Sequence, residues 1–386
     1  MNRRDFVKRA SVVSWFTLAP ELSFALAGST PYNRLLVLVE LKGGNDGLNT
    51  VVPYADSEYY RLRPRLGVAR DQVLKLDERC GLNPAMTALM PMWGARELAI
   101  VQGVGYAQPN LSHFRSIDIW DTASNTDEYL QQGWLARAFA RAPAPADFVA
   151  EGIVLGSQET GPLTGENVRT LALSDPRRFL RQASLLNDSG RPRNAALEHI
   201  LKVERDVAQA ASKLSLDLDF RTAFPQGQFG NAVKTAAQVI GGKGQVAAVK
   251  ISLTGFDTHS NQVAGQTRLL QELAEGLSAF KAALTEVGKW DSTLVMTYAE
   301  FGRRPKENQS GGTDHGTANV HFVLGGKVKG GLYGQPPQLG RLDGNGNLAF
   351  AVDFRSLYAT VLESWWALPS ADVLGGRFAA LPLLRA

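Results

Sequence analysis

The 386-residue chain contains a single cysteine, Cys80, and only five histidines. One cysteine can form no disulfide within the chain, and it excludes a zinc or redox cluster built from several thiolates. The chain also lacks a strong excess of either charge, since 41 basic residues stand against 37 acidic ones. This balance argues against nucleic acid as a partner, because a nucleic-acid surface needs basic residues gathered on one face.

Long hydrophobic runs are missing as well. No segment has the roughly 20 apolar residues that span a bilayer, and the best candidate, residues 10–26, is interrupted by Ser14, Pro20 and Glu21. The G-x-S-x-G elbow of α/β-hydrolases and the glycine-rich nucleotide loops are also absent. With 44% hydrophobic residues, the chain can nonetheless build a large core. We therefore expect a folded protein whose mature form has no integral membrane segment.

The first 27 residues are typical of an export signal. A basic head precedes the apolar stretch, and Ala25-Leu26-Ala27 has the small residues of a cleavage site. The pair Arg3 and Arg4 resembles the bacterial twin-arginine (Tat) signal, which a receptor reads as an address. An amphipathic helix with incidental arginines is the alternative. We expect the Tat export machinery as a partner, a periplasmic or secreted location, and a mature chain of residues 28–386.

Buried-strand patterns and helical patterns alternate along the chain. Apolar runs without strict alternation predict strands covered on both faces, at residues 35–41, 98–104, 246–253, 293–298 and 321–324. Apolar residues three and four positions apart predict helices at residues 84–95, 195–214, 264–287 and 354–368. This order predicts an α/β fold, a three-layer α/β/α sandwich with a mainly parallel central sheet. We expect one domain, with a loop and helical insertion around residues 156–232.

Polar side chains follow the predicted strands, where open parallel sheets bind their ligands. They are Asn45 and Asp46, Ser112 and His113, Asp257 and His259, and then Glu300, Asp314 and His315.

Two of these groups combine an aspartate with a histidine. Asp257 with His259, and Asp314 with His315, offer an oxygen ligand and an imidazole, a mixture that suits zinc, manganese or iron. For either pair alone, a turn-capping aspartate beside a surface histidine is the alternative. Two such pairs, together with Asp46, favour a metal site.

Four other polar residues allow more than one interpretation. Ser112 precedes a helical run at residues 113–123, so it is either an N-cap or a nucleophile at the positive end of the helix. His113 could contact an anionic substrate. Glu300 could be a metal ligand or a base, or form an ion pair with a nearby arginine. His321 is expected to begin a buried strand, with metal ligation as the alternative.

Several segments together resemble the bacterial family called domain of unknown function 1501. They are the twin-arginine start and residues 40–54, 101–120, 255–262 and 298–326, which include the specific block GGTDHGTAN. That family resembles the alkaline phosphatase and sulfatase superfamily, which implies an alkaline phosphatase-like α/β/α fold.

The resemblance also implies two metal positions. Asp46, Asp314 and His315 map to one of them, and Asp257 and His259 map to the other. A further histidine is usual at the second position, and His321 is the candidate for it. Ser112 matches the position of the superfamily's nucleophile, whereas Glu300 follows Asp257 instead of preceding it, unlike the carboxylate of a third metal. Cys80 lies outside the C-x-P-S-R signature, which excludes a formylglycine sulfatase.

These observations lead to one main hypothesis and two alternatives. We expect a periplasmic hydrolase of phosphate or related esters, which uses one or two divalent ions, zinc or manganese, on a small anionic ester substrate. The first alternative is a non-catalytic secreted binding or assembly protein that keeps the fold and a structural metal. The second is a metal-dependent oxidoreductase, which needs no nucleophile at Ser112.

Overall fold

A computed structural model describes residues 31–385 of the chain, except residues 167, 184–209 and 215. The export signal predicted at residues 1–27 lies outside the described residues, as does most of the helix predicted at residues 195–214.

A nine-stranded sheet forms the centre of the molecule, in the order β11-β5-β10-β9-β1-β8-β6-β7, with β12 paired to β5. Strand β10 runs antiparallel to both of its neighbours, and the other pairs are parallel. The predicted mainly parallel sheet is thus confirmed. The strands are β1 (Leu35–Lys42), β5 (Leu98–Gly105), β6 (Ala150–Leu155), β7 (Thr170–Leu173), β8 (Val246–Thr254), β9 (Thr293–Tyr298), β10 (Asn319–Leu324), β11 (Gly331–Gly334) and β12 (Val352–Asp353).

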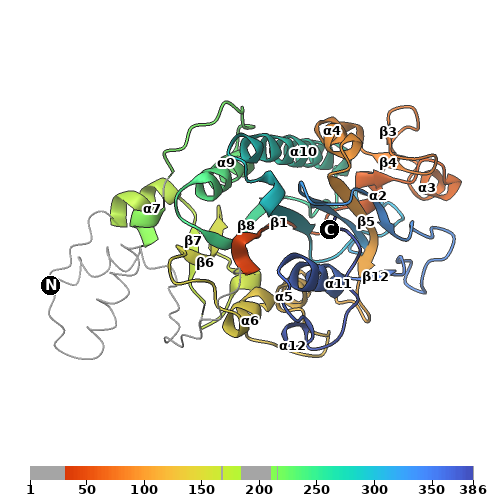
Figure 1. Cartoon of the computed structure of the whole chain (residues 1–386). Coiled ribbons are helices and arrows are strands. Elements are labelled where there is room, and N and C mark those ends of the chain that lie inside the picture. The colour runs from red at the N-terminus through yellow and green to blue at the C-terminus, as the bar shows by residue number, and fades with distance from the viewer. Residues whose placement is uncertain (1–30, 167, 184–209, 215, 386) are drawn as a thin grey trace, which may run out of the picture.

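Helices cover both faces of this sheet, as Figure 1 shows. On β1, Val37 and Val39 pack into a core with α9 and α10, whereas Leu36 and Leu38 pack into a second core on the opposite face. This second core includes residues of α5, α6 and α11. The three predicted layers are therefore confirmed, and the double burial explains why residues 35–39 of β1 are all apolar. The bounds are α5 (His113–Thr122), α6 (Trp134–Arg141), α9 (Gln228–Gly241), α10 (Gln262–Glu286) and α11 (Phe354–Ala359).

Shorter elements complete the described part of the fold. A small three-stranded sheet, in the order β2-β4-β3, lies between β1 and β5 in the sequence. Its strands are β2 (Val51–Val52), β3 (Leu74–Lys75) and β4 (Gly81–Leu82). The remaining helices are α2 (Gly47–Thr50), α3 (Ser57–Leu62), α4 (Met90–Gly94), α7 (Pro176–Ala183) and α12 (Ala371–Leu374), with 3₁₀ turns η1 (Pro31–Asn33), η2 (Pro84–Leu89), η3 (Gly161–Leu163) and η4 (Trp290–Ser292) and a π-helical turn η5 (Thr360–Trp365).

The five strands that the apolar runs predict correspond to β1, β5, β8, β9 and β10. Four strands of the nine-stranded sheet, β6, β7, β11 and β12, were not predicted, and β7 lies inside the range expected to form an insertion.

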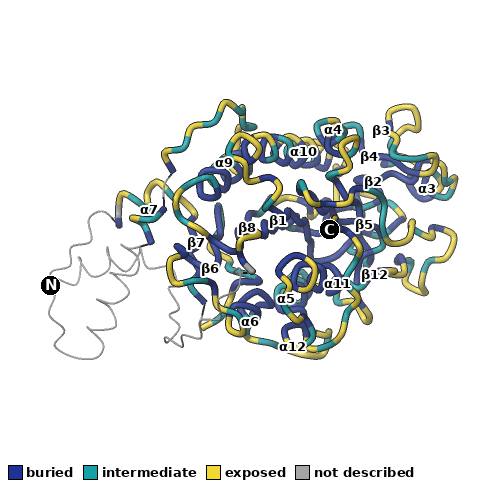
Figure 2. Tube along the Cα trace, viewed as in Figure 1, coloured by how far each residue is buried: buried dark blue, intermediate teal, exposed yellow. Residues whose placement is uncertain are grey.

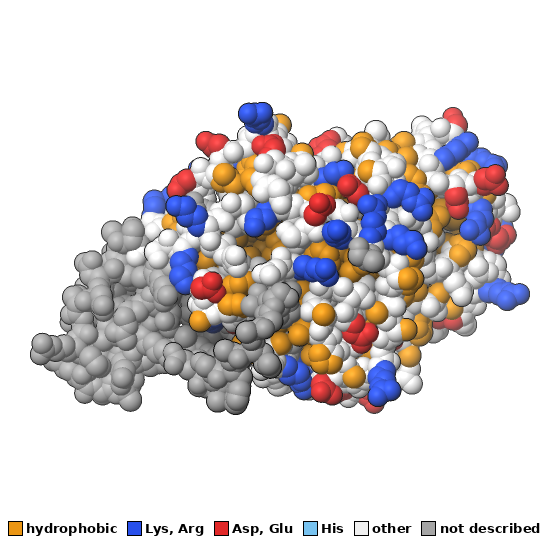
Figure 3. Space-filling view, viewed as in Figure 1, with side chains coloured by type: hydrophobic (Ala, Val, Ile, Leu, Met, Phe, Trp, Pro, Cys, Tyr) orange, Lys and Arg blue, Asp and Glu red, His pale blue; other side chains and the backbone are white. Residues whose placement is uncertain are grey.

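The sheet is buried along most of its length, and the exposed residues lie on turns, loops and the outer sides of the helices (Figure 2). Acidic and basic side chains are interspersed on the face seen in Figure 3. Among the described residues, no helix has the length and apolar character needed to cross a membrane.

Candidate metal centre

Three loops at one edge of the sheet meet at a group of histidines and aspartates. His113 begins α5 after the exit of β5, and Asp257 and His259 lie between β8 and α10. Asp314 and His315 lie on the long connection from β9 to β10. Because β5, β8 and β9 all point the same way, their carboxyl ends bring these loops together.

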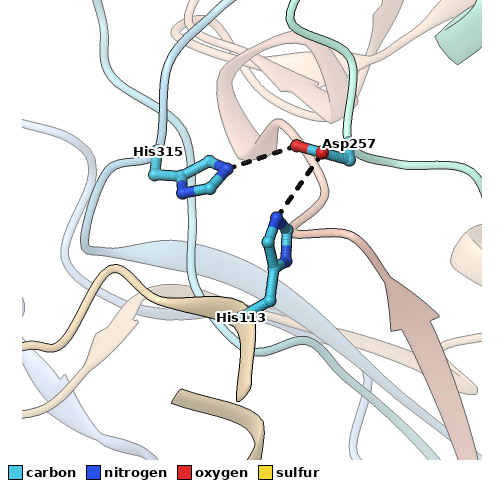
Figure 4. A group of neighbouring side chains, drawn as sticks. All are labelled: His113, Asp257 and His315. Atoms are coloured by element: carbon cyan, nitrogen blue, oxygen red, sulfur yellow. Dashed lines mark hydrogen bonds and ion pairs between the residues drawn. The ribbon is translucent and has the colours of Figure 1, made fainter. Parts of the chain in front are cut away.

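Asp257 lies at the middle of this group (Figure 4). The ligating atoms of His113, Asp257 and His315 all lie within 4.8 Å of one another. Asp257 Oδ2 is 3.5 Å from Nε2 of His113, and Asp257 Oδ1 is 3.2 Å from Nε2 of His315. His259 lies beside them, with its Nε2 3.0 Å from Asp257 Oδ1 and 2.9 Å from Nε2 of His315. Three imidazoles and one carboxylate therefore share one site.

Each of the three imidazoles has an oxygen atom close to its other nitrogen. In metal sites, such a partner fixes the ring so that the free nitrogen faces the ion. The Nδ1 contacts are His113 with Glu300 Oε1 at 3.0 Å, His315 with the Leu111 carbonyl at 2.8 Å, and, at a longer distance, His259 with Asp314 Oδ1 at 3.6 Å.

The donor set fits a divalent cation. If both Nδ1 atoms carry the proton, the Nε2 lone pairs of His259 and His315 face each other across 2.9 Å, an arrangement that needs a positive charge nearby. A zinc ion ligated at about 2 Å from each nitrogen would supply that charge. Imidazole and carboxylate ligands suit zinc and manganese. We conclude that His113, Asp257 and His315 could hold one ion, with His259 beside them.

The buried guanidinium of Arg303 ties the surrounding loops together. It donates hydrogen bonds to Asp257 Oδ1 at 2.6 Å, and to the carbonyl oxygens of Gly43, Gly44, Phe256 and Thr313. These carbonyls belong to the loops that follow β1, β8 and β9. The positive charge thus lies directly behind the central carboxylate.

This charge affects the protonation of the centre. Burial tends to raise the pKa of Asp257, but the hydrogen bond and charge of Arg303, with contributions from His315 and His259, lower it overall. Burial lowers the pKa of His315, and the charge of Arg303 adds to this effect, against the hydrogen bonds to Leu111 and Asp257. An ionised carboxylate and neutral imidazoles are the forms that bind metal.

Gly43, on the loop that follows β1, allows this loop to pass close to Asp257. Its φ is +114°, and a Cβ atom at this position would lie only 2.4 Å from the backbone nitrogen of Asp257. The Gly43 amide donates to Glu300 Oε1 at 2.9 Å, which holds the carboxylate behind His113. A side chain at position 43 would push the loop that follows β1 away from Asp257.

Asp46, predicted as a metal ligand, lies in a buried ion pair instead of among the histidines. Arg63 contacts both of its carboxylate oxygens, at 2.5 and 3.0 Å, and neither side chain of the pair is exposed. Gln262 donates to the same carboxylate at 2.5 Å. Arg63 and Gln262 thus contact both oxygens of the Asp46 carboxylate, and Asp46 is not part of the group around Asp257.

Gln262 links this buried pair to the two ligand loops. Its amide oxygen accepts hydrogen bonds from Thr313 at 2.7 Å and from Thr258 at 3.1 Å. Thr258 lies between Asp257 and His259, and Thr313 lies two residues before His315. Asp46 and Gln262 therefore support the centre from behind.

The structure also places the other candidate residues. Asn45 is buried and bonded to Thr50 and Gln266, away from the histidines. Ser112 is exposed immediately before His113, and its side chain makes no capping hydrogen bond. Glu300 is buried behind His113, with one carboxylate oxygen unpartnered.

His321 lies on β10 in the buried core, as expected from the sequence, and has no role in the centre. Its ring packs against Trp120 at a centroid distance of 5.1 Å. Neither of its ring nitrogens has a hydrogen-bond partner, and burial lowers its pKa to about 3.

The sequence interpretation missed three residues that support the centre, Arg63, Gln262 and Arg303. The sequence signal for Arg303 was its place just after a strand exit, where it was considered only as an ion-pair partner of Glu300. Gln262 is the last residue of the segment 255–262 that resembles the family. Arg63 has no comparable signal, because it lies on a connection remote from the strand exits.

Several solved structures are similar to this chain at low identity. A protein in the alkaline phosphatase superfamily from Vibrio parahaemolyticus is 10% identical, with a TM-score of 0.44 over 98% of this chain and 78% of that one. The phosphonate monoester hydrolase SpPMH from Silicibacter pomeroyi is 9% identical, with a TM-score of 0.42 over 89% and 76%. The zinc complex of the C-terminal periplasmic domain of EcEptC from Escherichia coli is 12% identical, with a TM-score of 0.36 over 80% and 76%.

No curated protein matches the sequence significantly. A family model, in contrast, covers most of the chain, from residue 33 to residue 373, and it is described as a protein of unknown function, DUF1501. The chain belongs to the DUF1501 family.

Proposed function

We propose that this protein is a metal-dependent hydrolase of phosphate or related esters, with one divalent ion, zinc or manganese, held by His113, Asp257, His259 and His315. The observation that carries the proposal is the convergence of His113, Asp257 and His315, with His259 in contact with Asp257 and an oxygen atom close to the Nδ1 of each histidine. The twin-arginine-like start supports export through the Tat pathway and a periplasmic location.

A divalent ion at this position would withdraw charge from an ester oxygen and so activate the ester toward attack. The chain's own groups would orient the reaction. Ser112 lies at the N-terminus of α5, and its hydroxyl makes no capping hydrogen bond. It lies between His113 and Leu111, whose carbonyl oxygen contacts Nδ1 of His315. The positive end of the helix favours an anionic substrate there.

Ser112 is the proposed nucleophile. Its oxygen would form a bond to the phosphorus as the bond to the leaving alcohol breaks, and water would then release the phosphate from the serine. Arg303 and Glu300 would act indirectly, the first by keeping Asp257 ionised and the second by orienting His113. Substrate contact is therefore assigned to Ser112 and to the ion held by the four ligands.

Metal analysis and an ester screen test this function. We expect about one equivalent of zinc or manganese in the full chain, and its loss in Asp257→Ala and His315→Ala. We also expect hydrolysis of a set of phosphomonoesters and phosphodiesters by the wild type, reduced at least 100-fold in Ser112→Ala. Ser292→Ala is the matched control, because Ser292 lies immediately before β9 and therefore at the amino ends of the strands, whereas the centre lies at their carboxyl ends.

The possible results separate the alternatives. A wild-type protein that binds no metal would refute the centre. A loaded protein that hydrolyses no ester would refute the hydrolase and favour a non-catalytic binding or assembly protein. Full ester hydrolysis by Ser112→Ala would refute the nucleophile.

A further inference from the structure

A pocket lies near the carboxyl ends of the strands, and none of its lining residues belongs to the candidate metal centre. It has a volume of about 530 Å³ and lies between α5, residues 129–133 and residues 158–164. Its last wall follows the exit of β6, where open α/β sheets collect ligands. The volume is in the range of small-molecule sites.

The wall formed by residues 158–164 is fixed in place. Lys250 donates to the carbonyl oxygen of Glu159 at 3.0 Å, and Lys42 forms an ion pair with the Glu159 carboxylate at 2.5 Å. The amide of Gly133 donates to the Thr164 carbonyl at 2.8 Å. Contacts to neighbouring segments therefore hold the pocket open. A ligand would bind without first ordering this wall, which lowers the entropy cost of binding.

The acids of the pocket are neutralised without a ligand. Arg115 pairs with Asp118, and Lys42 pairs with Glu159. Burial, opposed by the Lys250 charge and assisted by the Glu40 charge, raises the pKa of the third acid, Asp121, to about 8. At neutral pH Asp121 is therefore mainly a neutral group that can both donate and accept a hydrogen bond.

An exposed aromatic ring lies at the rim. Tyr129 is 72% exposed, and the guanidinium of Arg115 lies 4.1 Å from its ring centroid. Arg115 is itself anchored by Asp118 and by backbone carbonyls, so the ring has a firm support. Amide and hydroxyl groups of Gln158, Gln131, Thr160 and Thr164 line the remaining wall.

We propose that this pocket binds a neutral polyhydroxylated compound, such as a sugar, with its hydroxyl groups on Asp121, Gln158 and Thr164 and its C–H face on Tyr129. A cationic ligand would need an unpaired carboxylate, and both ionised carboxylates already have partners. An anionic ligand would meet those carboxylates without any lysine or arginine among the lining residues. Paired donors and acceptors beside an aromatic ring suit a neutral polyol.

Binding is tested on the full chain after removal of metal, so the result does not depend on the proposed hydrolase. Glucose and N-acetylglucosamine serve as neutral probes, ethanolamine as the cation and inorganic phosphate as the anion. Saturation-transfer NMR detects binding and calorimetry measures it. For a monosaccharide in an open site we expect a dissociation constant of roughly 1–5 mM.

Four variants, one of them a control, identify the site and the character of the ligand. Tyr129→Ala is expected to weaken sugar binding about tenfold, whereas Tyr333→Ala, on β11, leaves it unchanged. Asp121→Asn keeps a neutral hydrogen-bonding group and is expected to retain binding, whereas Asp121→Leu abolishes it.

Three results would overturn the proposal. The first is saturable binding of ethanolamine or phosphate in preference to both sugars. The second is the absence of saturable sugar binding, and the third is sugar binding that Tyr129→Ala and Asp121→Leu leave intact.

Discussion

The buried ring of His321 predicts a specific loss of stability in acid. The folded protein holds this imidazole neutral with a pKa of about 3, whereas an unfolded chain has the ordinary value of 6.5. Because the folded pKa is the lower one, the contribution of His321 to stability is intact above pH 6.5. It falls as the pH drops below 6.5 and levels off below pH 3.

The size of this effect follows from the shift. One pKa unit corresponds to about 1.4 kcal/mol, so at pH 5 protonation of the unfolded chain at His321 lowers the free energy of unfolding by about 2 kcal/mol. At pH 3 the loss is about 4 kcal/mol, and it approaches about 5 kcal/mol at still lower pH. His321→Leu removes the titrating group and also two unpartnered ring nitrogens.

Denaturant unfolding, followed by tryptophan fluorescence at pH 5 and pH 8, tests this prediction. We expect His321→Leu to gain about 2 kcal/mol relative to the wild type at pH 5 beyond any difference seen at pH 8. Phe322→Leu, the neighbouring buried position on β10, is the control and should show the same difference at both pH values. Equal pH dependence in His321→Leu and the wild type would refute the reasoning.

Two further predictions concern buried polar contacts. Gln262→Ala is expected to weaken zinc binding about 10- to 100-fold, because it releases both ligand loops, as measured by competition with a chromophoric chelator. Gln238→Ala, which removes an equally buried glutamine on α9, is the control, and equal affinity in both variants would contradict the supporting role. Lys250→Met is expected to destabilise the fold by about 3–5 kcal/mol in thermal or urea unfolding, because it leaves the buried Glu40 carboxylate without its 2.9 Å partner. Adding Glu40→Gln should restore most of that loss, and an unchanged double variant would count against an ion-pair origin.

The layers of the fold were predictable because both faces of the sheet are covered, which makes strands such as β1 and β8 mainly apolar. The antiparallel direction of β10 could not be predicted, since its residues fit a parallel or an antiparallel strand equally well. Strand β6 was missed because Glu151 and Gly152 interrupt its apolar run, and the edge strand β7 was missed because it has only four residues.

At the site, proximity to strand ends identified Asp257, His259 and His315 as candidate ligands and His113 as a candidate substrate contact, and the topology then brings them together. The partner of Asp46 could not be inferred in the same way. A buried carboxylate is satisfied equally by a cationic side chain or by a metal ion, and only the tertiary structure shows that Arg63 lies against it.

The four side chains of the centre come from three loops that follow different strands, and these strands are not consecutive in the sheet. An ion can therefore meet its full set of ligands only after β5, β8 and β9 have assembled. In the unfolded chain, Asp257 and His315 are 58 residues apart, so early capture would require closing a long loop. Metal uptake should accordingly be a late event in the maturation of this protein, and the affinity for metal would report whether the sheet has been completed.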